Sequence, residues 1–140
     1  TDALLVWGGD VMYLYYWMVK SGLADLLPSL DRLVYVGVSA GSIVLTPYNH
    51  DAEFDLTTVP EGSDRGEAEG DRALGFVDFT LVPHLDHEDF VPEHSLAGIK
   101  QWAADLPVPT YAIDDQTAIR VVDGRVEVVS EGNWELITPG

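Results

Sequence analysis

The 140-residue sequence contains no cysteine, which excludes disulfides, thiolate metal sites and a cysteine nucleophile. Basic residues are also scarce, because 7 Lys and Arg stand against 24 Asp and Glu, for a formal net charge of −17. Nucleic acids and anionic membranes are bound through basic surfaces, so we expect neither as a partner. An acidic excess of this kind is typical of a solvated surface that promotes solubility.

Long hydrophobic runs are missing as well. No apolar run approaches the roughly 20 residues that a membrane-spanning helix needs, and no basic leader precedes an apolar segment, so we expect a cytoplasmic protein. Hydrophobic residues nevertheless make up 46% of the chain, which excludes a disordered acidic tail. We expect residues 1–140 to form a single domain with its own core.

Short apolar runs alternate with segments of helical periodicity. The runs predict strands at residues 3–7, 33–38, 74–82 and 110–113, and the periodic segments predict helices at 11–19, 23–30, 39–45 and 93–106. An alternating hairpin at 118–129 turns at Asp123-Gly124, and a last strand follows at 134–137. This order predicts an α/β fold, a three-layer sandwich with a mostly parallel sheet and a C-terminal β-hairpin.

Residues 48–72 interrupt the alternation. They are polar, rich in Asp, Glu and Gly, and show little periodicity. We expect an acidic surface loop here, which is either a solvated insertion or a carrier of part of a site.

Ser39 lies at the centre of Gly37-Val38-Ser39-Ala40-Gly41, which fits the G-x-S-x-G pattern. A predicted strand precedes the serine and a predicted helix follows it, and in this context the pattern forms a sharp turn that exposes a nucleophilic hydroxyl. The start of the helix offers N–H groups to a developing oxyanion. We therefore predict that Ser39 is a nucleophile, rather than part of a turn that merely needs small residues.

A serine nucleophile needs a base, and His84 lies just after a predicted strand, where open α/β sheets place their sites. We predict that His84 is this base and that His50, His87 and His94 are ordinary polar residues.

The base in turn needs an acid that orients its ring. Asp114 and Asp115 follow the strand predicted at 110–113, and we prefer them to the other candidates, Asp51, Asp55 and Asp78.

The histidines also permit a metal-site hypothesis. Nitrogen and oxygen ligands suited to zinc cluster along one stretch, namely His84, Asp86, His87, Glu88, Asp89, Glu93 and His94. Against a metal, the His-x-x-His spacing falls in a predicted loop, and no second ligand cluster is evident. We therefore expect no metal and no cofactor.

Four segments, spread over nearly the whole chain, carry a resemblance to a known family: Val6-Trp7-Gly8-Gly9-Asp10, the serine segment 37–41 with Pro47 beyond it, Val82-Pro83-His84, and Tyr111-Ala112-Ile113-Asp114-Asp115. They resemble peptidase family S51, the peptidase E or aspartyl dipeptidase group. The fold of this family is similar to that of class I glutamine amidotransferase domains, with Ser in place of Cys.

The resemblance implies a serine-type peptidase that hydrolyses dipeptides or other short peptides, including those with an N-terminal Asp. Ser39 would attack the peptide carbonyl, and His84 would carry the proton. Asp115 is the better match for the acid, although an Asp in the loop after the nucleophile, near Asp51 or Asp55, has been considered in relatives.

The resemblance also implies an oxyanion hole formed by the backbone N–H groups of Gly9 and Ala40. Candidate residues for binding the substrate are Asp10 in the first turn, and Glu88 and Glu93 close to His84, whose carboxylates suit a substrate ammonium group.

The chain departs from the family pattern in three ways. Trp7 and Asp10 stand where the family usually has a third Gly and an Asn, so substrate contacts there should differ. The chain lacks the usual N-terminal βα units, which predicts either a missing N-terminal segment or a homodimer that covers the first strand. Cations for an aspartyl substrate are few, with only Arg65 and Arg72 nearby.

A rival hypothesis is non-enzymatic: a catalytically inactive amidotransferase-like domain used for binding or assembly. The helix predicted at residues 11–19 is apolar on all sides and would suit a partner. Hydrolysis of carboxyl esters would use the same catalytic residues as peptide hydrolysis.

Overall fold

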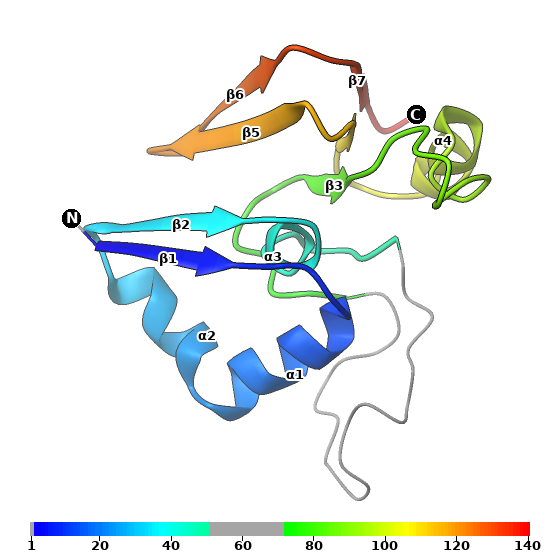
Figure 1. The fold of residues 1–140 in the computed structure, drawn as a ribbon. Coiled ribbons are helices and arrows are strands. Elements are labelled where there is room, and N and C mark those ends of the chain that lie inside the picture. Colours follow the sequence, from blue (N-terminus) through cyan, green and yellow to red (C-terminus); the bar gives the residue numbers. More distant parts are fainter. Residues whose placement is uncertain (1, 51–71) are drawn as a thin grey trace, which may run out of the picture. The chain divides into compact units, whose positions relative to one another are not determined.

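A computed structural model describes residues 2–50 and 72–140 (Figure 1). The chain divides into two compact units, residues 1–78 and residues 79–140, and each is described by itself. The single domain expected from the sequence therefore stays a prediction. Most of the predicted acidic loop, with Asp51, Asp55 and Arg65, lies outside the described residues.

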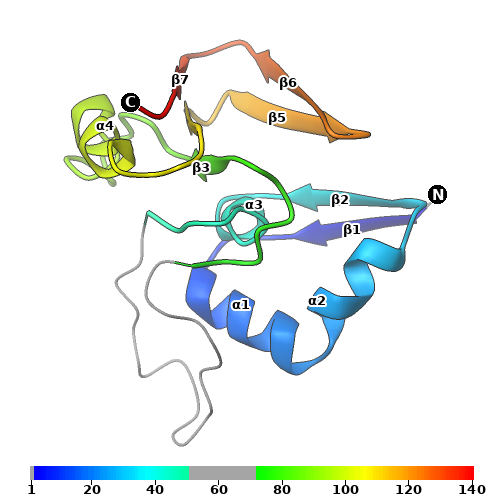
Figure 2. The same ribbon diagram turned by 180° about the vertical axis from the view of Figure 1, so that it is seen from behind.

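The first unit has a two-stranded parallel sheet. Its elements in chain order are β1 (Asp2–Val6), α1 (Val11–Lys20), α2 (Leu23–Leu26), the 3₁₀ turn η1 (Leu27–Ser29), β2 (Leu33–Gly37) and α3 (Ala40–Ile43). Helices α1 and α2 lie on one face of the sheet, and α3 lies beyond the carboxyl ends of the strands (Figures 1 and 2). The register runs from Asp2 opposite Leu33 to Val6 opposite Gly37. The chain crosses between the two strands through α1 and α2, as parallel pairing requires.

The helical face of this sheet holds the core of the first unit. Its buried apolar side chains come from α1, α3 and the residue after α3: Val11, Met18, Ala40, Ile43 and Val44. Strand side chains alternate between faces, so Leu5, Val34 and Val36 lie on the opposite face and are exposed. Leu5 is 68% exposed, and Trp7, directly after β1, is 73% exposed.

The strand predicted at residues 74–82 is wrong over its first two-thirds, because β3 covers only Thr80–Val82. The preceding residues bond to the segment that follows α3: the N–H of Leu74 donates to the carbonyl of Val44, and the N–H of Phe76 donates to that of Leu45. These N–H groups are therefore not available for hydrogen bonds to an adjacent strand.

The second unit contains a three-stranded sheet and a separate hairpin. Its elements are β3, α4 (Leu96–Ala103), β4 (Thr110–Ile113), β5 (Thr117–Val122), β6 (Arg125–Ser130) and β7 (Trp134–Ile137). β4 pairs in parallel with β3 and antiparallel with β7. The predicted hairpin is confirmed, because β5 and β6 pair antiparallel around Asp123 and Gly124, both with positive φ.

Helix α4 is shorter than the predicted segment 93–106. Ser95 begins it, because the Ser95 hydroxyl accepts the N–H of Gly98 at 3.2 Å, as an N-cap residue does. The core of this unit joins α4 to the sheet through Val82, Leu85, Ile99 and Ala112. In the described part of the chain, no helix combines the length and apolarity needed to cross a membrane.

Candidate active site

Ser39 connects β2 to α3 through a left-handed backbone conformation, with φ 54° and ψ −116°. Residues other than glycine rarely adopt such angles, and such strain persists only where the surrounding structure fixes it. The Ser39 carbonyl accepts the N–H groups of Ser42 and Ile43 at 2.9 and 3.0 Å, so the serine also begins the first turn of α3. The sharp turn predicted from the sequence is present.

Two glycines allow this turn to form. A Cβ atom at Gly37 would overlap the backbone carbonyl of Gly41, and a Cβ atom at Gly41 would overlap the carbonyl of Val6. The strand before the serine and the helix after it therefore approach closely enough to exclude any side chain. Both glycines are required by packing.

The glycine turn after β1 passes beside the serine side chain. A Cβ atom at Gly8 would lie 3.4 Å from the Cβ and 3.7 Å from the Oγ of Ser39. Gly9 follows with φ 134°, an angle that favours glycine. The first unit thus brings together two of the predicted segments, Gly8-Gly9 and Ser39-Ala40.

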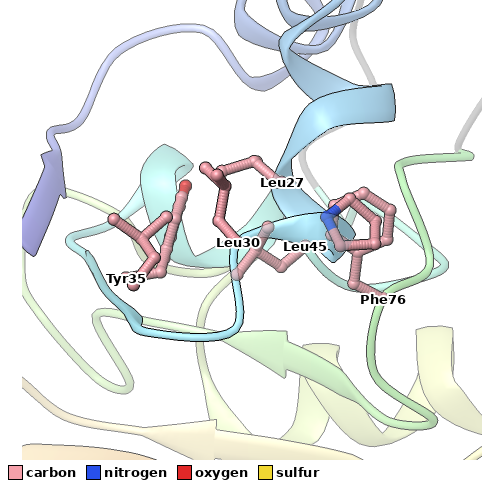
Figure 3. Close-up of a pocket in the computed structure, with 7 residues that line it drawn as sticks. Leu27, Leu30, Tyr35, Leu45 and Phe76 are labelled. Carbon is pink, nitrogen blue, oxygen red and sulfur yellow. The ribbon is translucent and has the colours of Figure 1, made fainter. Parts of the chain in front are cut away.

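An apolar cavity of about 300 Å³ lies in the same unit and does not include Ser39 in its lining (Figure 3). Its lining is mostly leucine, and comprises Leu27, Pro28, Leu30, Leu33, Tyr35, Leu45 and Phe76. The Tyr35 hydroxyl donates to the carbonyl of Gly41 at 2.6 Å. Burial raises the pKa of Tyr35 to about 12, so the hydroxyl keeps its proton near neutral pH and ties β2 to α3.

In the second unit, His84 and Asp115 meet. They follow the parallel strands β3 and β4, whose carboxyl ends lie at the same edge of the sheet. Nδ1 of His84 lies 2.7 Å from Oδ1 of Asp115, so the ring N–H donates to the carboxylate. This contact determines which ring nitrogen carries the proton in the neutral histidine, namely Nδ1. His84 itself has a φ of 60°.

Asp114, the neighbouring candidate, has a different setting. Its carboxylate accepts the backbone N–H groups of Gln116 and Asn133 and the hydroxyl of Thr117. Burial alone raises the pKa of Asp114, but these hydrogen bonds outweigh that effect and hold the pKa below its usual value. Asp114 therefore ties the turn after β4 to the turn before β7, and Asp115 is the carboxylate in contact with His84.

Phe90, which no sequence pattern indicated, lies against His84. The ring of Phe90 stacks on that of His84, with centroids 4.4 Å apart and planes 8° apart. His87 lies on the other side of the acid, with its Nε2 4.0 Å from Oδ2 of Asp115. No motif marks Phe90, since only the course of the loop returns it to His84.

His94 does not share this chemistry. It is buried, and its Nδ1 donates to the carbonyl of Pro83 at 2.6 Å. Within residues 2–50 and 72–140, no three His, Asp or Glu side chains are placed to hold a metal ion. The metal hypothesis gains no support from the described residues.

The three predicted substrate-binding carboxylates lie in different places. Asp10 caps α1, because its Oδ1 accepts the N–H of Tyr13 at 2.6 Å. Glu88 and Glu93 are exposed in the loop between β3 and α4. Arg72, the described candidate for holding an acidic substrate, lies with its guanidinium 5.9 Å from the centre of the Tyr48 ring.

Comparison with known proteins places these observations in a family. The model of peptidase family S51 matches residues 1–129. A crystal structure of a candidate peptidase E protein from Listeria monocytogenes EGD-e is similar, with a TM-score of 0.59 and 20% identity over 94% of this chain. Sequence comparison with curated proteins gives no match.

The chain spans 61% of the length of that crystal structure. At this level of identity the likeness shows the fold. It confirms the predicted α/β class, with parallel strand pairs and a C-terminal hairpin, and it is consistent with a fold like that of class I glutamine amidotransferases.

Proposed function

Because the chain belongs to peptidase family S51, we propose that it is a serine-type peptidase that hydrolyses dipeptides or other short peptides with a free N-terminus. The observation that carries this proposal is the left-handed serine between β2 and α3. Such a conformation costs about 1–3 kcal/mol, which glycine would avoid. A serine in that position is best explained by its hydroxyl.

Acylation begins when Oγ of Ser39 attacks the carbonyl carbon of the scissile peptide and its proton passes to Nε2 of His84. The carbonyl oxygen becomes an oxyanion, to which the N–H groups of Gly9 and Ala40 donate. Collapse of this intermediate breaks the C–N bond. The leaving amine takes the proton from His84, and an acyl ester remains on Ser39.

Deacylation repeats these steps with water. A water molecule gives a proton to His84 and attacks the ester carbonyl, and a second oxyanion forms at the same N–H groups. Its collapse breaks the ester C–O bond, and the proton on His84 returns to Oγ of Ser39. The products are a carboxylic acid and the regenerated serine.

Asp115 orients the base in this mechanism. Its 2.7 Å hydrogen bond fixes the proton on Nδ1 of His84, which leaves the lone pair on Nε2 to accept the serine proton. The same carboxylate stabilises the imidazolium that forms during attack. The hydrogen bonds of Asp114 to three other groups support the choice of Asp115 over its neighbour.

We assign the substrate ammonium group to Glu88 and Glu93, which are exposed in the loop that begins at His84. Asp10 is less suited, because its carboxylate already accepts the N–H of Tyr13. Changing both glutamates to Gln should raise KM several-fold without changing kcat. Glu131→Gln, at an exposed position after β6, is the matched control. An unchanged KM in the double variant refutes the assignment.

A preference for N-terminal Asp has less support. Lys100 pairs with Glu135, and Arg120 lies 2.9 Å from Glu127, so these two cations are engaged with carboxylates of the chain. The negative net charge also slows the approach of acidic peptides. We therefore propose short peptides as the substrate class, with aspartyl peptides as one member of it.

The test is hydrolysis of a panel of aspartyl and non-aspartyl dipeptides by the chain and by Ser39→Ala, after circular dichroism has shown both to be folded. The proposal predicts hydrolysis by the wild type, a loss of at least about 10³-fold in the variant, and a ranking of substrates that defines the specificity. A folded wild type that hydrolyses no peptide overturns it.

A binding or assembly role is the second candidate, favoured by the exposed apolar side chains of Leu5, Trp7, Val34 and Val36. A homodimer is the simplest form of such an assembly. Light scattering distinguishes the two roles: a binding module forms a stable complex without any Ser39-dependent hydrolysis, whereas a peptidase shows that hydrolysis in whichever oligomeric state it adopts.

A further inference from the structure

The loop of residues 84–95 folds back on the histidine that begins it. The N–H of Asp86 donates to the carbonyl of His94 at 2.9 Å, which closes the loop. Inside it, the N–H of Phe90 donates to the carbonyl of His87, and the N–H of His94 donates to the carbonyl of Phe90, both at 3.0 Å. These backbone bonds determine where the side chain of Phe90 lies.

Three histidine rings surround Phe90. His84 is the nearest and is stacked face to face at 4.4 Å, whereas His94 and His87 lie at 5.3 and 5.6 Å with tilted planes. The parallel stack with His84 is thus the closest ring contact of Phe90. Aromatic rings in offset or parallel stacks attract each other beyond the effect of burial alone.

Core packing does not account for this side chain. Phe90 is 41% exposed, and it is absent from the buried cluster of Val82, Leu85, Ile99 and Ala112. Its loop is polar and acidic. Its ring contacts within the described residues are the three histidines, so a change at Phe90 should disturb His84 more than the stability of the unit.

Two contacts hold the His84 ring in its orientation, a hydrogen bond and a ring stack. The hydrogen bond from Nδ1 joins the His84 ring to Asp115, whose side chain is 54% exposed, so this bond alone allows the ring and the carboxylate to move together. A second ring stacked on the face of His84, with planes 8° apart, restricts that movement.

Building on the proposed function, we propose that Phe90 is a positioning residue that fixes the plane of the His84 ring against Asp115 during proton transfer. Phe90→Leu should lower kcat roughly 10-fold and leave KM unchanged, because misorientation of a base acts on the chemical step. Phe90→Tyr keeps the stacking ring and should retain most of the activity. Phe76→Leu, the same substitution at a 42% exposed position in the other unit, is the control.

Nuclear magnetic resonance supplies a measurement that does not depend on activity. The ring current of Phe90 should shift the carbon-bound ring protons of His84 upfield in the wild type and in Phe90→Tyr, and this shift should disappear in Phe90→Leu. Absence of the shift in the wild type overturns the stack. A kcat within twofold of the wild type in Phe90→Leu, with the shift lost, overturns the positioning role.

The two proposals fail in different ways. Ser39-dependent hydrolysis that is insensitive to Phe90→Leu removes only the role of Phe90. If the wild type shows no Ser39-dependent hydrolysis, the proposed function falls and the positioning role falls with it, even where the resonances show the stack.

Discussion

The two units hold their candidate catalytic residues by different means. In the first unit the constraint is in the backbone: Ser39 has a φ of 54°, and Gly37 and Gly41 allow strand and helix to approach too closely for any side chain. In the second unit the constraint is in side chains, because His84 is held by a hydrogen bond to Asp115 and by the stacked ring of Phe90.

This difference has a consequence for mutations. A backbone constraint is part of the fold, so breaking it should cost stability and activity together. A constraint made by half-exposed side chains is separable from the fold, so breaking it should lower activity in a protein that still folds. Substitution of the glycines that hold the Ser39 turn should therefore lower stability and activity together, whereas substitution of the side chains that hold His84 should lower activity alone.

The largest expected effect on activity lies in the second unit. Asp115→Asn should lower kcat by about 10³- to 10⁴-fold, because an amide no longer fixes the proton on Nδ1 of His84. Steady-state kinetics on the best dipeptide measures it, with circular dichroism as the check on folding. Activity within a few-fold of the wild type would remove Asp115 from the mechanism.

The next effect is on stability, in the first unit. Gly41→Ala should lower the free energy of unfolding by about 3 kcal/mol, because its Cβ would overlap the carbonyl of Val6. Gly22→Ala is the control, since Gly22 has a φ of 81° with no atom near its missing Cβ, and should cost only about 1 kcal/mol. Urea denaturation compares them, and equal losses would contradict the packing argument.

The smallest expected effect is that of replacing Asp114, which should differ from the effect of replacing Asp115. Asp114→Asn should cost less than about 1 kcal/mol of unfolding free energy at neutral pH, because it weakens hydrogen bonds to a charged group that solvent screens, and should change kcat little. The pKa of Asp114 is lowered on folding. The stability that the ionised Asp114 contributes is therefore fully present above 3.8, the pKa in the unfolded chain. It is lost as the pH falls through the lower pKa of the folded protein.

Denaturation of the wild type and of Asp114→Asn in neutral and acidic buffer measures this difference. The gap in unfolding free energy should narrow only in acid. A gap that is independent of pH would contradict the lowered pKa of Asp114, and a large fall in kcat at unchanged stability would mean that Asp114 acts in the site.

The backbone turns at Ser39 and after β1 could be predicted from the local sequence. The G-x-S-x-G pattern and the Gly8-Gly9 turn are local in sequence. Glycines in such a pattern indicate positions where neighbouring backbone leaves no space for a side chain. The hairpin at Asp123-Gly124 was predictable for the same reason. The strand predicted at 74–82 failed at its start because apolar composition alone does not tell which partner takes the backbone hydrogen bonds.

The side-chain-held half was predicted less completely. Parallel strands predict that His84 and the acids after β4 share a sheet edge, and the pair formed as expected. The residues themselves left Asp114 and Asp115 as equal candidates, because neighbours at the end of a strand face opposite ways. Phe90 was missed because its contact with His84 depends on how the loop of residues 84–95 closes. Hydrophobic periodicity in the sequence does not predict loop closure.

The central claim is that His84 activates Ser39. Reaction of the chain with a fluorophosphonate, followed by mass spectrometry of its peptides, tests this directly. The account predicts an adduct on Ser39 and on no other serine, formed much more slowly in a folded His84→Gln variant. An unmodified Ser39 in the folded chain, or equal rates in both proteins, would contradict it.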